Sequence, residues 1–129
     1  MRTTTPFDVA LHHIHIRVEI DTGEGLPWRV KGLLDSGAPW TEVSDKFLFH
    51  AGLLDQVPEG AALKPGLETQ KYGKLVLPQL RVCGQILGNF EVRVSRFEES
   101  WDIAALVGLD FFRRFPVTID YHRAVLEVG

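Results

Sequence analysis

The amino-acid sequence predicts an all-β fold class, mainly β-strands with one or two short helices, in a single domain spanning residues 1–129. Residues 14–20 alternate apolar and polar side chains with a period of two, which is typical of a strand with one buried face. Clusters of glycine, proline and aspartate separate this segment from similar ones further along the chain. Residues that typically start and end helices lie only a few positions apart, so the predicted helices are short.

The predicted elements follow one another without a linker. Residues 14–20 and 28–34 are expected to form a hairpin around the glycine-rich turn at 21–27. Ser44 suits the N-cap of a short helix that ends at Gly52. The other predicted elements are a loop at 56–66, strands at 74–82 and 86–94, a short helix at 109–115, and a closing hairpin made by 117–119 and 124–128. The sequence leaves open whether residues 1–9 form a flexible arm or join an interface.

Length and composition limit the class of protein. With 129 residues, 45% of them hydrophobic, the chain can bury one core without a disulfide or structural metal. The net charge of −3 and the single short basic cluster at Arg113–Arg114 argue against nucleic-acid binding. Cys83 is the only cysteine, which excludes an intramolecular disulfide. Residues 1–10 lack a signal-peptide pattern, and no apolar run approaches the roughly 20 residues of a membrane span, so we expect a soluble cytoplasmic protein.

Two Asp-Ser/Thr-Gly triplets are candidates for a reactive site, Asp21–Gly23 and Asp35–Gly37. Such a triplet arises by chance in roughly one in twenty chains of this length, so only the context separates the two. Asp21–Gly23 lies between two amphipathic strands with charged residues nearby, as in an ordinary hairpin turn. Asp35–Gly37 follows an apolar strand, where rigid structure on both sides can position a reactive acid. We therefore interpret Asp35 as the catalytic candidate and Asp21 as a turn residue.

Two separate motifs, in the same order along the chain, resemble one protein family. Leu33–Pro39 with Thr41–Ser44 resembles the active-site signature of retropepsin-like aspartic proteases, in which two apolar residues precede Asp, Ser or Thr, Gly and Ala. Ala105–Phe115 is similar to the family's second element, two apolar residues and a glycine that pass behind the catalytic loop before a short helix. Val117–Asp120 with Leu126–Val128 resembles the terminal hairpin of cellular and bacterial members.

The resemblance implies a retropepsin-like acid protease barrel with one lobe per chain, acting as an aspartic endopeptidase on a peptide or protein substrate without metal or other cofactor. Such enzymes use two carboxylates that share one proton, because two like charges a few ångströms apart cannot both ionise. One acts as a base on water while the other polarises the scissile carbonyl. Asp21 and Asp35 are too near in sequence to be two such halves. The second carboxylate is therefore expected from Asp35 of another copy, in a two-fold homodimer.

The same resemblance assigns roles within the catalytic triplet. Asp35 would be the catalytic carboxylate, and Ser36 would hydrogen-bond across the two-fold axis to hold the two loops together. Gly37 would let the backbone approach the substrate.

Four further residues are expected to bind substrate. Ala38 follows the triplet and points to the retropepsin branch, and Trp40 lies close enough in sequence to line a subsite. A turn around Lys71–Lys74 is the best candidate for a flap over the cleft, which adds Tyr72 and Gly73.

Other interpretations of these residues remain open. The rival function is a retropepsin-like module for dimerisation or peptide binding without catalysis, because Ser36 and Ala38 suit a structural turn equally well. His13 and His15 would share one strand face, but no third metal ligand has suitable spacing, which favours a solvated face. Asp110 is interpreted as a cap or first-turn acid of the second helix.

Overall fold

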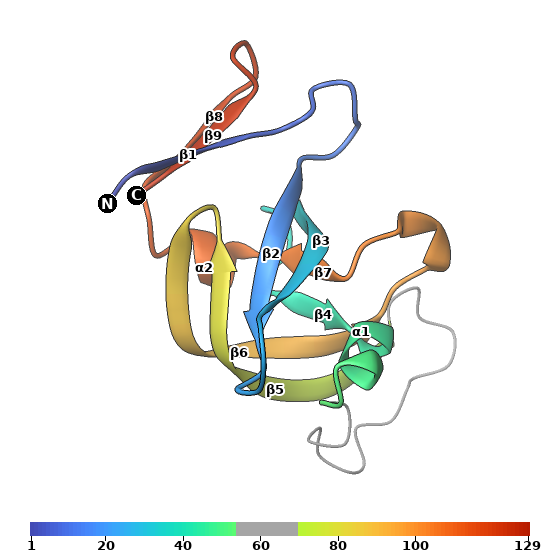
Figure 1. The fold of residues 1–129 in the computed structure, drawn as a ribbon. Coiled ribbons are helices and arrows are strands. Elements are labelled where there is room, and N and C mark those ends of the chain that lie inside the picture. The colour runs from blue at the N-terminus through green and yellow to red at the C-terminus, as the bar shows by residue number, and fades with distance from the viewer. Residues whose placement is uncertain (54–69) are drawn as a thin grey trace.

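The computed structural model describes residues 1–53 and 70–129 and confirms a mainly β fold with two short α-helices (Figure 1). In chain order the elements are β1 (Thr3–Pro6), β2 (His15–Asp21), β3 (Trp28–Leu34), β4 (Glu42–Ser44), α1 (Asp45–His50), β5 (Gln70–Val82), β6 (Gln85–Arg96), the 3-10 helix η2 (Glu99–Trp101), β7 (Ala105–Val107), α2 (Leu109–Phe112), β8 (Val117–Asp120) and β9 (Val125–Val128). Six strands close into a barrel in the order β2-β3-β7-β4-β6-β5. The terminal strands form a separate sheet in the order β1-β9-β8.

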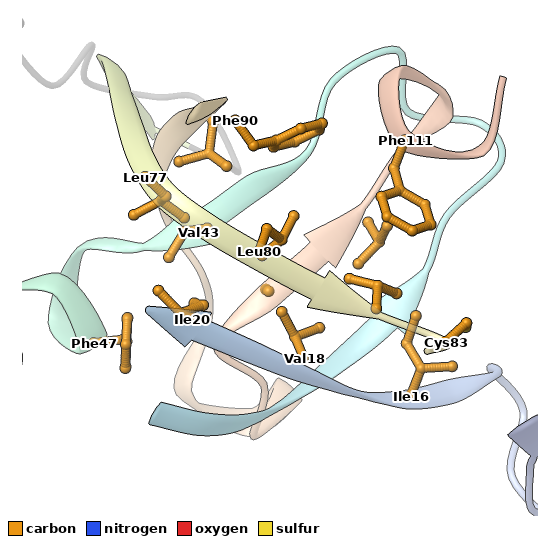
Figure 2. Packing of buried hydrophobic residues seen from close by; sticks show 14 of the residues in the cluster. Ile16, Val18, Ile20, Val43, Phe47, Leu77, Leu80, Cys83, Phe90 and Phe111 are labelled. Carbon is orange, nitrogen blue, oxygen red and sulfur yellow. The ribbon is translucent and has the colours of Figure 1, made fainter. Parts of the chain in front are cut away.

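The hydrophobic core fills the barrel. In β2, Ile16, Val18 and Ile20 are buried while the residues between them are exposed or half-buried, which confirms the predicted alternation. Figure 2 shows these three side chains in one cluster with Leu77 and Leu80 of β5. Burying an aliphatic side chain of this size contributes about 1.5–3 kcal/mol to stability. The core therefore holds rigidly the strands from which the candidate site projects.

The long hairpin of β5 and β6 ends at a two-residue turn, Cys83-Gly84, close to where the sequence predicts one. Both residues have positive φ, 50° and 75°, the combination that the commonest two-residue hairpin turn needs. A Cβ on Gly84 would lie 2.7 Å from the Thr3 side chain, so glycine is required by space as well as by backbone conformation. Thr3 Oγ1 also donates a hydrogen bond to the Cys83 carbonyl, which joins the turn to the terminal sheet.

Part of the segment 1–9 belongs to the terminal sheet. Thr3–Pro6 form β1 and pair with β9 in antiparallel register, so this part of the arm is an ordered strand. Gln85 Nε2 donates to the Val128 carbonyl at 3.0 Å and links the sheet to β6. In the order β1-β9-β8, the strands β1 and β8 lie at the two edges.

Both predicted helices are present. Ser44 caps α1 through its side chain, which accepts a hydrogen bond from the Phe47 N–H at 3.4 Å. The second helix is shorter than expected, since α2 ends at Phe112. No helix in the described part of the chain is long and apolar enough to cross a membrane.

The predicted turn at Lys71–Lys74 is wrong. These residues belong to β5, and the pairing with β6 shifts register between Lys71 and Gly73, as at a β-bulge. Gly73 therefore marks an irregularity inside a continuous strand and not a hairpin tip. The loop predicted at 56–66 lies outside the described residues.

Candidate active site

Asp35 lies directly after the strand β3, at the point where the chain leaves the barrel wall. Its backbone N–H donates to the Val107 carbonyl of β7 at 2.9 Å. The preceding N–H, of Leu34, donates to the Ile14 carbonyl beside β2 at 3.0 Å. Because neighbouring chain segments on both sides hold the backbone here, the half-buried Asp35 side chain starts from a fixed position.

The triplet itself forms a tight turn. Asp35 Oδ1 accepts a hydrogen bond from the Gly37 N–H at 3.0 Å, and the Ala38 N–H donates to the Asp35 carbonyl at 3.1 Å. Ser36 and Gly37 are exposed at the tip of the turn. The structure thus brings four predicted site residues together in one loop: Asp35, Ser36, Gly37 and Ala38. Within the triplet, Asp35 is half-buried and the other two residues are exposed.

The second motif packs behind this loop, as the sequence predicts. The Leu109 and Asp110 N–H groups donate to the carbonyls of Ala38 and Pro39, at 2.9 and 3.1 Å. A Cβ on Gly108 would lie 2.7 Å from the carbonyl oxygens of both Ala38 and Trp40. Only glycine permits this close approach, because the atoms that a side chain would meet belong to the backbone.

A buried network beneath the loop includes roles that sequence reasoning missed. Thr41 is fully buried, and its Oγ1 donates to Asp110 Oδ1 at 2.7 Å while accepting from the Gly108 N–H at 3.1 Å. The Thr41 N–H donates to Asp110 Oδ2 at 2.9 Å. Asp110 Oδ1 also accepts a hydrogen bond from the Phe111 N–H, which agrees with its interpretation as a first-turn acid of the second helix. Through its bonds to Thr41, the same carboxylate also fixes the end of the catalytic loop.

A cavity of about 480 Å³ opens beside Asp35. Its walls combine apolar side chains from β3, β7 and η2 with two imidazoles and the Asp35 carboxylate. The lining residues are His13, His15, Leu33, Leu34, Asp35, Ser100, Trp101 and Leu106. The predicted solvated face of His13 and His15 is therefore one wall of this cavity. The residues described include no group of three or more His, Cys, Asp or Glu able to hold a metal ion.

The predicted substrate-binding residues lie in different places. Ala38 adjoins the triplet, whereas Trp40 is 46% exposed, with the Arg93 guanidinium 4.6 Å from its ring centroid, and does not line the cavity beside Asp35. Gly73 lies at the β5 bulge, and the side chain of Tyr72 lies outside the described part of the structure. The substrate-binding roles of all four residues stay predictions.

Cys83 is unsuited to nucleophilic chemistry. Its side chain is buried at the β5–β6 turn, and burial raises the pKa of its thiol to about 11, against a smaller lowering by a hydrogen bond with Thr5. The thiolate, which is the nucleophile, is therefore scarce at neutral pH.

Comparison with known proteins identifies the fold. No protein-family model matches the sequence, and no curated protein is significantly similar to it. Among solved structures, a retropepsin-like aspartic protease from Rickettsia conorii matches with a TM-score of 0.70 and 18% identity, over 99% of this chain and 89% of that one. The retroviral protease-like domain of Ddi1 from Leishmania major matches with a TM-score of 0.61 and 20% identity, over 85% and 82%. The chain therefore has the retropepsin-like fold that its motifs predict.

Proposed function

We propose that this chain, which has the retropepsin-like fold, is an aspartic endopeptidase that acts as a homodimer. The observation that carries the proposal is the placement of Asp35. Its carboxylate stands on a loop fixed by Val107 and Gly108, beside a cavity large enough for a substrate side chain. The R. conorii structure of the same fold is described as an aspartic protease, which supports the reaction class.

The chemistry requires a second carboxylate. In a dyad the two groups share one proton, so that one abstracts a proton from water while the other donates a hydrogen bond to the scissile carbonyl. The attacking oxygen and the carbonyl carbon then form a tetrahedral intermediate, which collapses as the amide nitrogen leaves with a proton. Among the described residues that line the cavity, Asp35 is the only carboxylate. We assign the missing one to the partner subunit's Asp35.

Two features of the single chain support pairing about a two-fold axis. Ser36 and Gly37 are exposed at the tip of the turn, where an equivalent loop from a second copy has access to them. The terminal sheet leaves β1 and β8 as edge strands, and unpaired strand edges are surfaces that natural proteins cover or block. A cytoplasmic location stays part of this proposal and can be tested by cell fractionation.

The proposal is tested with a diverse peptide mixture, incubated across acidic to neutral pH and analysed by mass spectrometry. The wild type and an Asp21→Asn variant are expected to give the same products, while Asp35→Asn gives none. Sedimentation across a concentration series is expected to show a dimer for all three proteins. Cleavage by Asp35→Asn would contradict the site assignment. Peptide binding without cleavage by the wild type would instead support the non-catalytic module.

A further inference from the structure

Besides Asp35, the cavity lining contains two ionisable residues, His13 and His15, and the dyad chemistry gives them no role. Both line the space beside Asp35, and His15 is half-buried there. Histidine provides hydrogen-bond donors, and in its protonated form both ring nitrogens donate. Two hydrogen-bond donors beside a catalytic carboxylate influence which substrate side chain the cavity can bind.

The strand register places His15 beside the apolar residues of the cavity. His15 pairs with Leu33 across β2 and β3, and Leu33 pairs with Leu106 across β3 and β7, so these three residues form a row on one face of the sheet. The hydrogen bond from the Leu34 N–H to the Ile14 carbonyl continues the same register one step further. His13 precedes this register, in the bend before β2, and lines the same cavity as Asp35. The cavity therefore combines apolar side chains with the two imidazoles.

Cationic side chains line a groove next to this cavity. His15 also lines an adjoining groove of about 430 Å³, together with Arg17, Arg29 and Lys31. Two of these cations have acidic partners: Arg29 Nε lies 3.3 Å from a Glu19 carboxylate oxygen, and Lys31 Nζ lies 3.2 Å from one of Asp102. Because Arg29 and Lys31 are paired with carboxylates, the two imidazoles are the cavity groups that would bind a negatively charged ligand group.

We propose that this cavity is a specificity pocket that selects a glutamate side chain next to the scissile bond of the substrate, an inference that rests on the proposed endopeptidase function. The methylene groups of glutamate would pack on Leu33, Leu106 and Trp101. Its carboxylate would accept hydrogen bonds from His13 and His15. An extended peptide bound at Asp35 directs neighbouring side chains alternately to opposite sides, so one of them faces this cavity.

The competing expectation is a purely apolar pocket. Leucine would fill the same floor but leave the imidazole donors without a ligand partner. Glutamine has the shape of glutamate and no charge. Comparing the three side chains at one position therefore separates the contribution of the charge from those of shape and apolar contact.

The test uses three peptides that differ only at one residue next to the scissile bond, which is Glu, Gln or Leu. The wild type is expected to cleave the Glu peptide with a kcat/KM about tenfold above that of the Gln peptide at pH 5, because both imidazoles donate to the charged carboxylate. His13→Gln and His15→Gln each remove one of the two imidazole donors and are expected to reduce this ratio to about threefold. His12→Gln is the matched control, because His12 is exposed and lies outside the cavity lining, and it should keep the wild-type ratio.

Binding of uncleavable analogues distinguishes failure of this inference from failure of the proposed function. In these analogues a reduced CH₂–NH link replaces the scissile amide, and calorimetry measures their affinity. Cleavage with equal rates for Glu and Gln, or a ratio that survives both histidine substitutions, would overturn the pocket assignment alone. Preferential binding of the Glu analogue without cleavage of any peptide would support the pocket and contradict the endopeptidase.

Discussion

The two Asp-Ser/Thr-Gly triplets of this chain make the same side-chain hydrogen bond and yet differ in backbone conformation and in their surroundings. Asp21 Oδ1 accepts from the Gly23 N–H at 2.8 Å, and Asp35 Oδ1 accepts from the Gly37 N–H at 3.0 Å. Gly23 lies at the exposed end of the β2–β3 hairpin, whereas the second triplet is backed by Gly108 and opens onto a cavity. The triplet alone therefore specifies a turn, and the segments packed against it determine what the turn can do.

Gly108 packs behind the second triplet, and Gly23 belongs to the first. Substituting these two glycines should give the largest contrast in stability and activity. Gly108→Ala places a Cβ 2.7 Å from two backbone carbonyl oxygens, so we expect a loss of about 3 kcal/mol in unfolding free energy together with most of the activity. In Gly23→Ala the atom nearest to the new Cβ lies 3.8 Å away, so the strain comes only from the φ of +89°. The unfolding free energy should fall by about 1 kcal/mol. Urea unfolding and peptide cleavage measure both effects. Equal destabilisation by the two substitutions would contradict the close packing behind the catalytic loop.

The two threonines provide the next contrast. Thr41→Val removes a buried hydroxyl that bonds to Asp110 and Gly108, so we expect about 2 kcal/mol of destabilisation and reduced cleavage. In Thr22→Val the lost bond is the solvent-exposed one to the Glu24 carbonyl, and the change should stay within about 0.5 kcal/mol. Thermal unfolding of both variants measures the difference. If Thr41→Val proves as stable and as active as the wild type, the buried network does not position the loop.

The smallest effect on stability should come from the aspartates themselves. Asparagine keeps an Oδ1 that can accept from the glycine N–H two residues on, so Asp21→Asn and Asp35→Asn should each change the unfolding free energy by less than about 1 kcal/mol. The two variants should then differ in activity alone. Marked destabilisation by Asp35→Asn would mean that its carboxylate has a structural role that the turn does not explain.

The sequence was sufficient to predict elements whose signals are local. The alternation in β2, the Ser44 cap and the turn near Cys83 each depend on residues adjacent in the chain, and the structure confirms all three. The strands β4 and β7 have three residues each, too few for a periodic pattern to show. Gly73 was misinterpreted as a turn residue because a glycine in a bulge and a glycine in a turn have the same local signature.

Parts of the candidate site that depend on distant residues could not be predicted. Thr41 and Asp110 are 69 positions apart, and only the folded barrel brings them together. In the same way, His13 and His15 acquire their place in a cavity wall from β3, β7 and η2, which lie further along the chain. The preference for Asp35 over Asp21 is based on local context, an apolar strand before the first and amphipathic strands around the second, and it stays a prediction.

Mixing of subunits tests most directly whether two copies of Asp35 share one active site. Wild type and Asp35→Asn are combined in equal amounts, at a fixed total concentration at which dimers form, and left to exchange. Random pairing leaves about one quarter of the dimers with Asp35 in both subunits, so cleavage should fall to about one quarter of that of the wild type alone. The same mixture made with Asp21→Asn should keep full activity. A fall to about one half with Asp35→Asn, the value for subunits that act independently, would contradict the shared dyad.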